Sequence, residues 1–182
     1  MTKQERILLM RQAGNIERCH LIPHLKEYTD AYHQYNCTIL LLELYPFEPS
    51  KNLLCATLTH DCGEIFIGDT PRSAKWFWPD FGKILLQIET DIDKEFGFGE
   101  SKYSLTKIEQ YWLKQIDILE LWLWCQDEIY GWNNQHAVEV LDNINENWTN
   151  DKRPLEINEF INEFNKIGWQ RINPRKFLKE IK

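Results

Sequence analysis

The sequence predicts a single all-α domain that spans residues 1–182. Three observations lead to this prediction. Apolar residues recur at helical spacing along most of the chain, no stretch shows the alternation that is typical of a strand, and Gly and Pro interrupt the pattern at intervals. The chain has 182 residues, of which 43% are hydrophobic and 27% charged, and this is the size and balance of one globular domain.

The breakers divide the chain into seven expected helices. They fall at Pro46–Pro49, Gly68–Pro71, Pro79, Gly97–Gly99, Gly131 and Pro154. The expected helices span residues 3–13, 27–45, 51–66, 80–96, 104–130, 134–147 and 155–168. Ser50 and Ser104 are the expected N-caps of the third and fifth helices, because a Ser hydroxyl accepts a hydrogen bond from an amide of the first turn.

The composition excludes several classes of protein. The formal net charge of −7 argues against a nucleic-acid polymer as partner, since proteins that hold a phosphate backbone present a basic surface. No apolar stretch reaches membrane-spanning length, and the run Ile7–Met10 is too short for a signal peptide. The five cysteines are an odd number without a CxxC pair, which indicates reduced thiols. We therefore expect a cytoplasmic protein without a membrane partner.

The strongest chemical signal is the pair His60-Asp61 in the expected helix 51–66. On a helix, His60 continues a row that begins at Leu53, and Asp61 continues the next row, which begins at Leu54. Both side chains are therefore expected to face the interior. A buried carboxylate without a partner is costly, and a metal ion that accepts both side chains removes that cost.

Two further helices direct a metal-binding group toward the core. Asp117 lies on an apolar stripe with Leu113 and Leu121, and His33 shares a face with Cys37. Two imidazoles and two carboxylates suit Mn, Fe, Co, Zn or Mg without distinguishing among them. Taken singly, each residue also fits a hydrogen-bonded core histidine or a chance His-Asp dipeptide.

Several motifs resemble the bacterial and viral HD-domain 5′-deoxynucleotidase family. They are Arg18-Cys19-His20, the segment Tyr28–His33, His60-Asp61-Cys62-Gly63-Glu64, Gly68-Asp69-Thr70-Pro71, Lys75, and the run Trp112–Glu120, which is similar to the last metal-binding helix of that family. The resemblance covers about residues 15–130, and its order H…HD…D with HDxxE and GDxP is specific. It implies that the bundle is an HD domain.

The resemblance also implies roles for individual residues. One divalent cation would be held by His33, His60, Asp61 and Asp117. Glu64 matches the catalytic acid of the family, and on a helix it follows His60 by one turn, within reach of a metal-bound water. Asp69 matches the residue that protonates the leaving oxygen. Glu120 and Lys114, on the last metal-binding helix, are expected to be solvated or to pair helices rather than to act in catalysis.

Three residues are implied to contact the substrate. Arg18 and Lys75 match phosphate-binding positions, where Arg makes bidentate contacts and Lys acts as a point charge. Cys19 stands where the family often has a Trp that limits room at the sugar 2′ position, and Gln34 stands where Ser is common after the first metal histidine. The departure at Cys19 bears on how strictly a deoxyribose is selected.

The function implied is a metal-dependent phosphohydrolase of small deoxynucleotides, in a bacterial cytosol or that of a virus-infected host. The chain is short, like the compact viral members, which favours a dNTP triphosphohydrolase that acts on dATP and releases the deoxynucleoside. The alternatives are a 5′-deoxynucleotidase acting on dNMPs, a non-catalytic nucleotide-binding HD module, and another HD chemistry with two metals. A homo-oligomer is also implied, with aromatic side chains near 76–81 and 122–132 available for its interface.

Overall fold

The computed structural model describes residues 1–97 and 100–172, and within them the fold is all-α, as the sequence predicts. Its α-helices are α1 (Lys3–Ala13), α2 (Asp30–Leu44), α3 (Lys51–Thr59), α4 (Arg72–Phe77), α5 (Pro79–Phe96), α6 (Glu100–Tyr103), α7 (Lys107–Gln126), α8 (Val138–Asn147) and α9 (Leu155–Ile167). A 3₁₀ turn at Cys62–Ile65 and a π-helical turn at Asp127–Gly131 add to these. In the same residues, extended pairing is limited to one bridge between Glu17 and Thr29.

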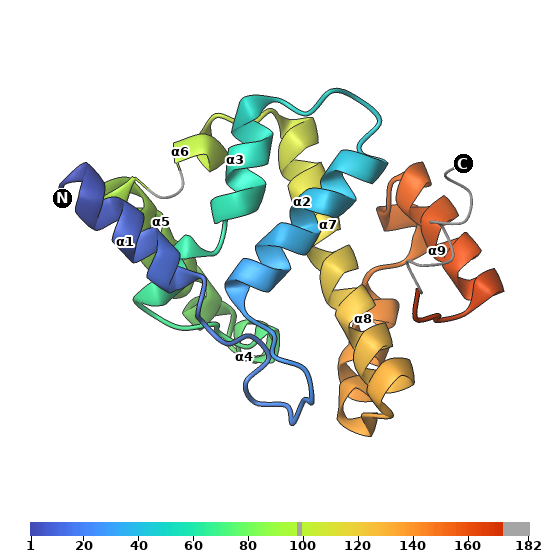
Figure 1. Ribbon diagram of the computed structural model, residues 1–182. Coiled ribbons are helices and arrows are strands. Elements are labelled where there is room, and N and C mark those ends of the chain that lie inside the picture. Colours follow the sequence, from blue (N-terminus) through green and yellow to red (C-terminus); the bar gives the residue numbers. More distant parts are fainter. Residues whose placement is uncertain (98–99, 173–182) are drawn as a thin grey trace, which may run out of the picture.

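The core lies where α2 crosses α7, with α3 packed against both (Figure 1). Leu41 of α2, Leu53 of α3, and Ile116 and Leu119 of α7 are fully buried there. Burying each such side chain contributes about 1.5–3 kcal/mol. This crossing fixes the positions of the three helix segments that hold the His and Asp residues singled out above.

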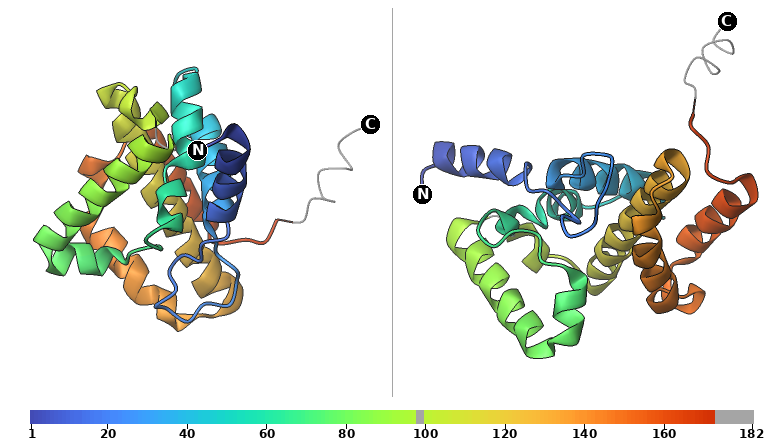
Figure 2. Two further views of the ribbon diagram at one scale, coloured as in Figure 1. Left: turned by 90° about the vertical axis from the view of Figure 1, so that its left-hand side faces the viewer. Right: turned by 90° about the horizontal axis from the view of Figure 1, so that it is seen from below.

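The other helices cover the two ends of the crossing. Helix α1 lies at one end and α9 at the other, and α4 and α5 form an angled pair on the periphery (Figures 1 and 2). No helix in the described ranges is both long and apolar enough to cross a membrane.

Side-chain caps fix the starts of α1, α2, α3 and α7. Thr2 and Glu5 form a capping box that starts α1 at residue 3, as predicted. Ser50 is confirmed as the cap of α3, since its hydroxyl accepts a hydrogen bond from Leu53 N at 3.1 Å. The prediction of Ser104 as a cap was wrong. The cap of α7 is Thr106, which forms a capping box with Glu109 three residues later. The residue three positions after Ser104 is a Lys, which cannot complete such a box.

The expected continuous helix 51–66 was also wrong, because α3 ends at Thr59. His60 and Asp61 form a turn, and the 3₁₀ turn Cys62–Ile65 follows. The carbonyl of His60 accepts a hydrogen bond from Lys102 Nζ at 3.0 Å, and the carbonyl of Asp61 accepts one from Glu64 N at 2.8 Å. These partners replace the i→i−4 bonds that a longer helix would make, and they point the two side chains past the end of α3.

Candidate metal centre

The structure brings together the four residues that were expected to hold a metal. His33 comes from α2, His60 and Asp61 from the end of α3, and Asp117 from α7. His33 Nε2 lies 3.3 Å from His60 Nε2, 3.3 Å from Asp117 Oδ1 and 3.7 Å from Asp61 Oδ2. His60 Nε2 lies 3.3 Å from Asp61 Oδ2. Nitrogen and oxygen atoms from three separate helix segments therefore face one small space.

Hydrogen bonds behind the two rings fix which nitrogen of each faces that space. His33 Nδ1 lies 2.5 Å from Glu120 Oε2, and His60 Nδ1 lies 2.9 Å from the carbonyl oxygen of Thr57. Both partners are acceptors, so each Nδ1 bears the proton and each Nε2 keeps its lone pair in the neutral imidazole. Burial lowers the pKa of His60, which favours the neutral ring.

The pKa of His33 is shifted in the opposite direction to that of His60 in the metal-free protein. Burial and the charge of Arg18 lower its pKa, but its contacts with Cys37 and Asp117 oppose them, and the pKa lies well above its ordinary value. A proton on Nε2 then occupies the direction in which a metal would bind. Metal and proton therefore compete for the same lone pair.

The spacing of the donor atoms fits a small divalent cation. Metal–ligand bonds of about 2.0–2.1 Å in a tetrahedral site place neighbouring ligand atoms roughly 3.3–3.4 Å apart. The separations of 3.3–3.7 Å among the four residues match such edges. Cys37 also lies close to both histidines, but burial raises the pKa of its thiol to about 11. The thiolate is the ligand form, so the carboxylates are the better donors.

Arg18 lies against the acidic side of this cluster. Its Nη1 is 2.5 Å from Asp61 Oδ2 and 3.1 Å from Asp30 Oδ1, and its Nη2 is 4.0 Å from Asp117 Oδ1. The expected phosphate-binding arginine thus sits beside two of the expected metal ligands. Asp30, which the sequence did not single out, is fully buried and accepts a hydrogen bond from the same guanidinium nitrogen as Asp61.

Glu64 lies beside Asp61, on the 3₁₀ turn rather than on the expected helix. One oxygen each of Asp30, Asp61 and Glu64 fall within 4.8 Å of one another. Glu64 Oε2 is buried and has no hydrogen-bond partner among the described residues. Burial, and then the charges of Asp61 and Asp30, raise the pKa of Glu64 to about 10. The group is therefore a protonated acid in the metal-free protein.

Asp69 and Cys19 meet at the rim of the cluster. The backbone N–H of Cys19 donates a hydrogen bond to Asp69 Oδ2 at 2.9 Å, which joins the loop after Arg18 to the loop after Gly68. Cys19 has φ 54°, in the left-handed region that L residues rarely adopt. Burial raises the pKa of its thiol to about 12, so Cys19 contributes a neutral thiol to this loop.

Lys75, the second expected phosphate-binding residue, pairs with Glu89 in this conformation. Its Nζ lies 3.5 Å from Glu89 Oε1, which joins α4 to α5. Both side chains are about one-third exposed, so the pair is partly hydrated and contributes little to stability.

Glu120 is the main residue that sequence reasoning missed. It was expected to be solvated or to pair helices, but only 2% of it is exposed. It does pair helices, since it joins α7 to His33 and Asn36 of α2. The available signal was its spacing, because a residue three positions after Asp117 shares the same face of a helix.

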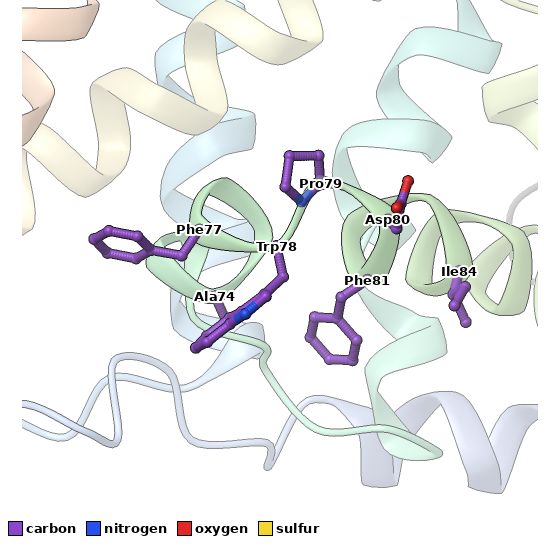
Figure 3. Close-up of a pocket in the computed structure, with 7 residues that line it drawn as sticks. All are labelled: Ala74, Phe77, Trp78, Pro79, Asp80, Phe81 and Ile84. Carbon is purple, nitrogen blue, oxygen red and sulfur yellow. The ribbon is translucent and has the colours of Figure 1, made fainter.

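A separate apolar pocket of about 570 Å³ lies at the corner between α4 and α5. Figure 3 shows Phe77, Trp78 and Phe81 projecting around it, and Phe77 is 78% exposed. The residues that line it include none of the four that surround the candidate metal position. The side chain of Trp76, part of the same expected aromatic group, lies outside the described residues.

Solved structures with the same fold include two phosphohydrolases. One is the HD phosphohydrolase DatZ of cyanophage S-2L, bound to dA and one catalytic Zn²⁺ ion, with 19% identity over 92% of this chain and 96% of that chain and a TM-score of 0.66. The other is the HD-domain phosphohydrolase lin2634 of Listeria innocua, with 22% identity over 79% of this chain and 78% of that chain and a TM-score of 0.62.

An archaeal protein has the same fold as well. The protein PH0347 of Pyrococcus horikoshii OT3 is 16% identical over 91% of this chain and 99% of that chain, with a TM-score of 0.67. No family model and no curated protein matches the sequence. The three structures establish that this chain has the HD-domain fold, which confirms the prediction from its motifs.

Proposed function

We propose that this chain is a metal-dependent phosphohydrolase of small deoxynucleotides. His33, His60, Asp61 and Asp117 would hold one divalent ion, which is Co, Mn, Mg, Fe or Zn. The observation that carries the proposal is the approach of two Nε2 atoms to 3.3 Å, each with an acceptor behind its ring. DatZ, which binds dA and one catalytic Zn²⁺, shares the fold and supports the proposal.

The bound ion would supply a water of lowered pKa and a positive charge that polarises a phosphoryl oxygen. Glu64 would take up the proton of the attacking water, since it lies beside Asp61. Burial and then the charges of Asp61 and Asp30 raise its pKa, and the ion would offset those charges. Asp69 would give a proton to the departing 5′ oxygen. The new bond joins the water oxygen to phosphorus, and the bond from phosphorus to the 5′ oxygen breaks.

Arg18 would neutralise the phosphate next to the ion. It already lies 2.5 Å from Asp61, so a phosphoryl oxygen bound at the ion would meet the guanidinium. Lys75 would add a second charge after leaving Glu89, and Cys19 would border the sugar. Fixed charges around the reacting group stabilise the charge that develops in the transition state.

The favoured substrate is a dNTP, with dATP first, cleaved to the deoxynucleoside and triphosphate. The bound dA of DatZ supports an adenine deoxynucleoside. The second candidate is a 5′-deoxynucleotidase acting on dNMPs. The pairing of Lys75 with Glu89 favours it, because it ties up a cation that the resemblance assigns to phosphate binding, and one phosphate needs less positive charge than three.

The test is incubation of the purified protein with Co²⁺, Mn²⁺, Mg²⁺ or Zn²⁺ and each dNTP, dNMP and ribonucleotide, followed by chromatography. Deoxyadenosine together with triphosphate is the expected product pair. Phosphate from monophosphates alone would select the second candidate. Binding without turnover of every nucleotide would make the chain a non-catalytic module and overturn the proposal.

We also propose that copies of this chain associate in the cytoplasm through the aromatic corner of α4 and α5. Phe77, Trp78 and Phe81 are 78%, 65% and 41% exposed and are contiguous with the pocket at that corner. Apolar surface gathered in this way is a common feature of protein interfaces. The chain would need neither a nucleic acid nor a membrane for its activity.

A further inference from the structure

We infer that Glu120 is a positioning residue of the metal centre. Its carboxylate would keep the proton of His33 on Nδ1 and thereby reserve Nε2 for the ion. The inference rests on the proposed function, since it concerns the same ion. It gives a role at the site to a residue that is not among the four expected ligands and that was expected only to be solvated or to pair helices.

Helix α7 contacts both nitrogens of the His33 ring. Asp117 Oδ1 lies 3.3 Å from Nε2, and Glu120 Oε2 lies 2.5 Å from Nδ1. The two acids stand three residues apart on one helix face, so a single rigid element sets both contacts. A rotation of the imidazole that improved one contact would weaken the other.

Two donors besides His33 reach the Glu120 carboxylate. Tyr28 Oη donates to Oε2 at 2.5 Å, and Asn36 Nδ2 donates to Oε1 at 3.3 Å. Because Tyr28 and His33 both approach Oε2, the ring has to contribute its Nδ1–H for all three bonds to be made at once. The arrangement thus selects one tautomer of His33.

The surroundings hold this carboxylate firmly in place. Tyr28 is fully buried and stacks on Trp124, with ring centroids 4.9 Å apart and an interplanar angle of 15°. Glu120 itself is 2% exposed. A buried carboxylate is costly unless it is hydrogen-bonded, and bonds to an ionised acceptor are about twice as strong as neutral ones. Carboxylates behind ligand histidines typically change metal affinity about 10–100-fold.

The test compares Glu120→Gln and Glu120→Leu with the wild type. Gln keeps an oxygen for His33 but loses the charge, and Leu loses both with little change in volume. Affinity for Zn²⁺ and Co²⁺, measured by competition with a chelator, should fall about 10-fold for Gln and up to about 100-fold for Leu. Long-range ¹H–¹⁵N NMR of the imidazoles should show Nδ1 of His33 protonated in the zinc-loaded wild type and a tautomer mixture in Glu120→Leu.

Glu128→Gln is a matched control. Glu128 is fully buried just after α7 and accepts hydrogen bonds from the backbone N–H groups of Leu25 and Lys26 at 3.0 and 3.1 Å. This variant should lower Tm but keep the affinity for Zn²⁺ within about twofold of the wild-type value. That change is much smaller than the roughly 10–100-fold change expected for a carboxylate behind a ligand histidine. Circular dichroism on all variants checks that they fold.

Wild-type affinity in a folded Glu120→Leu variant would overturn the inference, as would an equal loss of affinity in Glu128→Gln. If the Glu120 variants bind metal more weakly but the wild type hydrolyses no nucleotide, the proposed function fails and the inference stands. A wild type that binds neither ion overturns both.

Discussion

The Nε2 atoms of His33 and His60 face each other at a distance of 3.3 Å, although the residues are 27 positions apart in the chain. Behind the rings, Glu120 Oε2 and the carbonyl of Thr57 accept from the two Nδ1 atoms. Two lone pairs at this separation repel each other unless a proton or a cation lies between them. Binding of an ion should therefore stabilise the fold as well as permit catalysis.

Replacement of His60 by Ala should abolish stabilisation by metal. For the wild type, Zn²⁺ at a hundred times its Kd should add about 2.7 kcal/mol to the free energy of unfolding, which differential scanning calorimetry detects as a rise in Tm. His136→Ala, at an exposed histidine outside the cluster, should keep that rise. The same rise in His60→Ala would show that His60 is not a ligand.

Replacement of Glu64 by Gln should reduce kcat about 10²–10⁴-fold while metal affinity stays near that of the wild type, because the variant removes the base but not a ligand. Single-turnover rates and chelator competition give the two quantities. Glu95→Gln, an exposed acid on α5, is the control and should retain full activity. Unchanged turnover in Glu64→Gln would remove Glu64 from the mechanism.

The metal-free protein should lose stability as the pH rises from 5 to 8. Burial raises the pKa of Asp30 to about 7 and that of Glu64 to about 10, whereas in the unfolded chain both ionise near their ordinary values of 3.8 and 4.5. The folded state thus binds more protons across this window, and each extra proton lowers the free energy of unfolding by up to about 1.4 kcal/mol per pH unit.

Asp61 does not reverse this trend, because its pKa is lowered to about 2 and its effect on stability is confined to pH values below about 4. The lowered pKa of His60 opposes the trend, and the raised pKa of His33 adds to it. Urea denaturation with EDTA at each pH measures the slope. Excess Zn²⁺ should flatten it, since the ion replaces protons in the cluster. Rising stability between pH 5 and 8 in the metal-free protein would contradict the arrangement of Asp30 and Glu64 described above.

Replacement of Arg18 by Met should destabilise the metal-free protein by about 3–5 kcal/mol, because it leaves the buried carboxylate of Asp30 without its cation. The double variant Arg18→Met/Asp30→Asn should recover most of this loss. Urea denaturation of both variants and of Asp30→Asn completes a double-mutant cycle. A loss in the double variant equal to the sum of the losses in the two single variants would mean that the ion pair does not stabilise the fold.

Replacement of Trp78 and Phe81 by Ser should shift the protein toward the monomer, because it removes apolar surface from the proposed interface. Light scattering after size exclusion gives the mass. Leu155→Ser removes an equally exposed apolar side chain from α9 and should leave the mass unchanged. A wild type that is monomeric at working concentration would contradict the proposed association.

The helices were predictable from sequence where local signals decide them. The box of Thr2 and Glu5 starts α1, and Ser50 starts α3. The end of α3 was not predictable, because Lys102, 42 residues away, takes the carbonyl of His60. Its early end still leaves His60 and Asp61 facing inward, so their expected direction was right although the expected helix was not.

The candidate site was predictable in its motif residues and not in their partners. The spacing and the family resemblance single out His33, His60, Asp61 and Asp117, which the structure brings together. Asp30 and Glu120 resemble ordinary surface acids in the sequence. Their partners are Arg18 and His33, at separations of 12 and 87 residues, so the spacing of Glu120 from Asp117 gives its helix face but not its contact.

The most direct measurement is diffraction from zinc-soaked crystals at the zinc absorption edge. We expect a single anomalous peak about 2.0–2.2 Å from His33 Nε2, His60 Nε2 and one oxygen each of Asp61 and Asp117. A map with no peak between those four residues, or with the zinc bound only elsewhere on the chain, would contradict it.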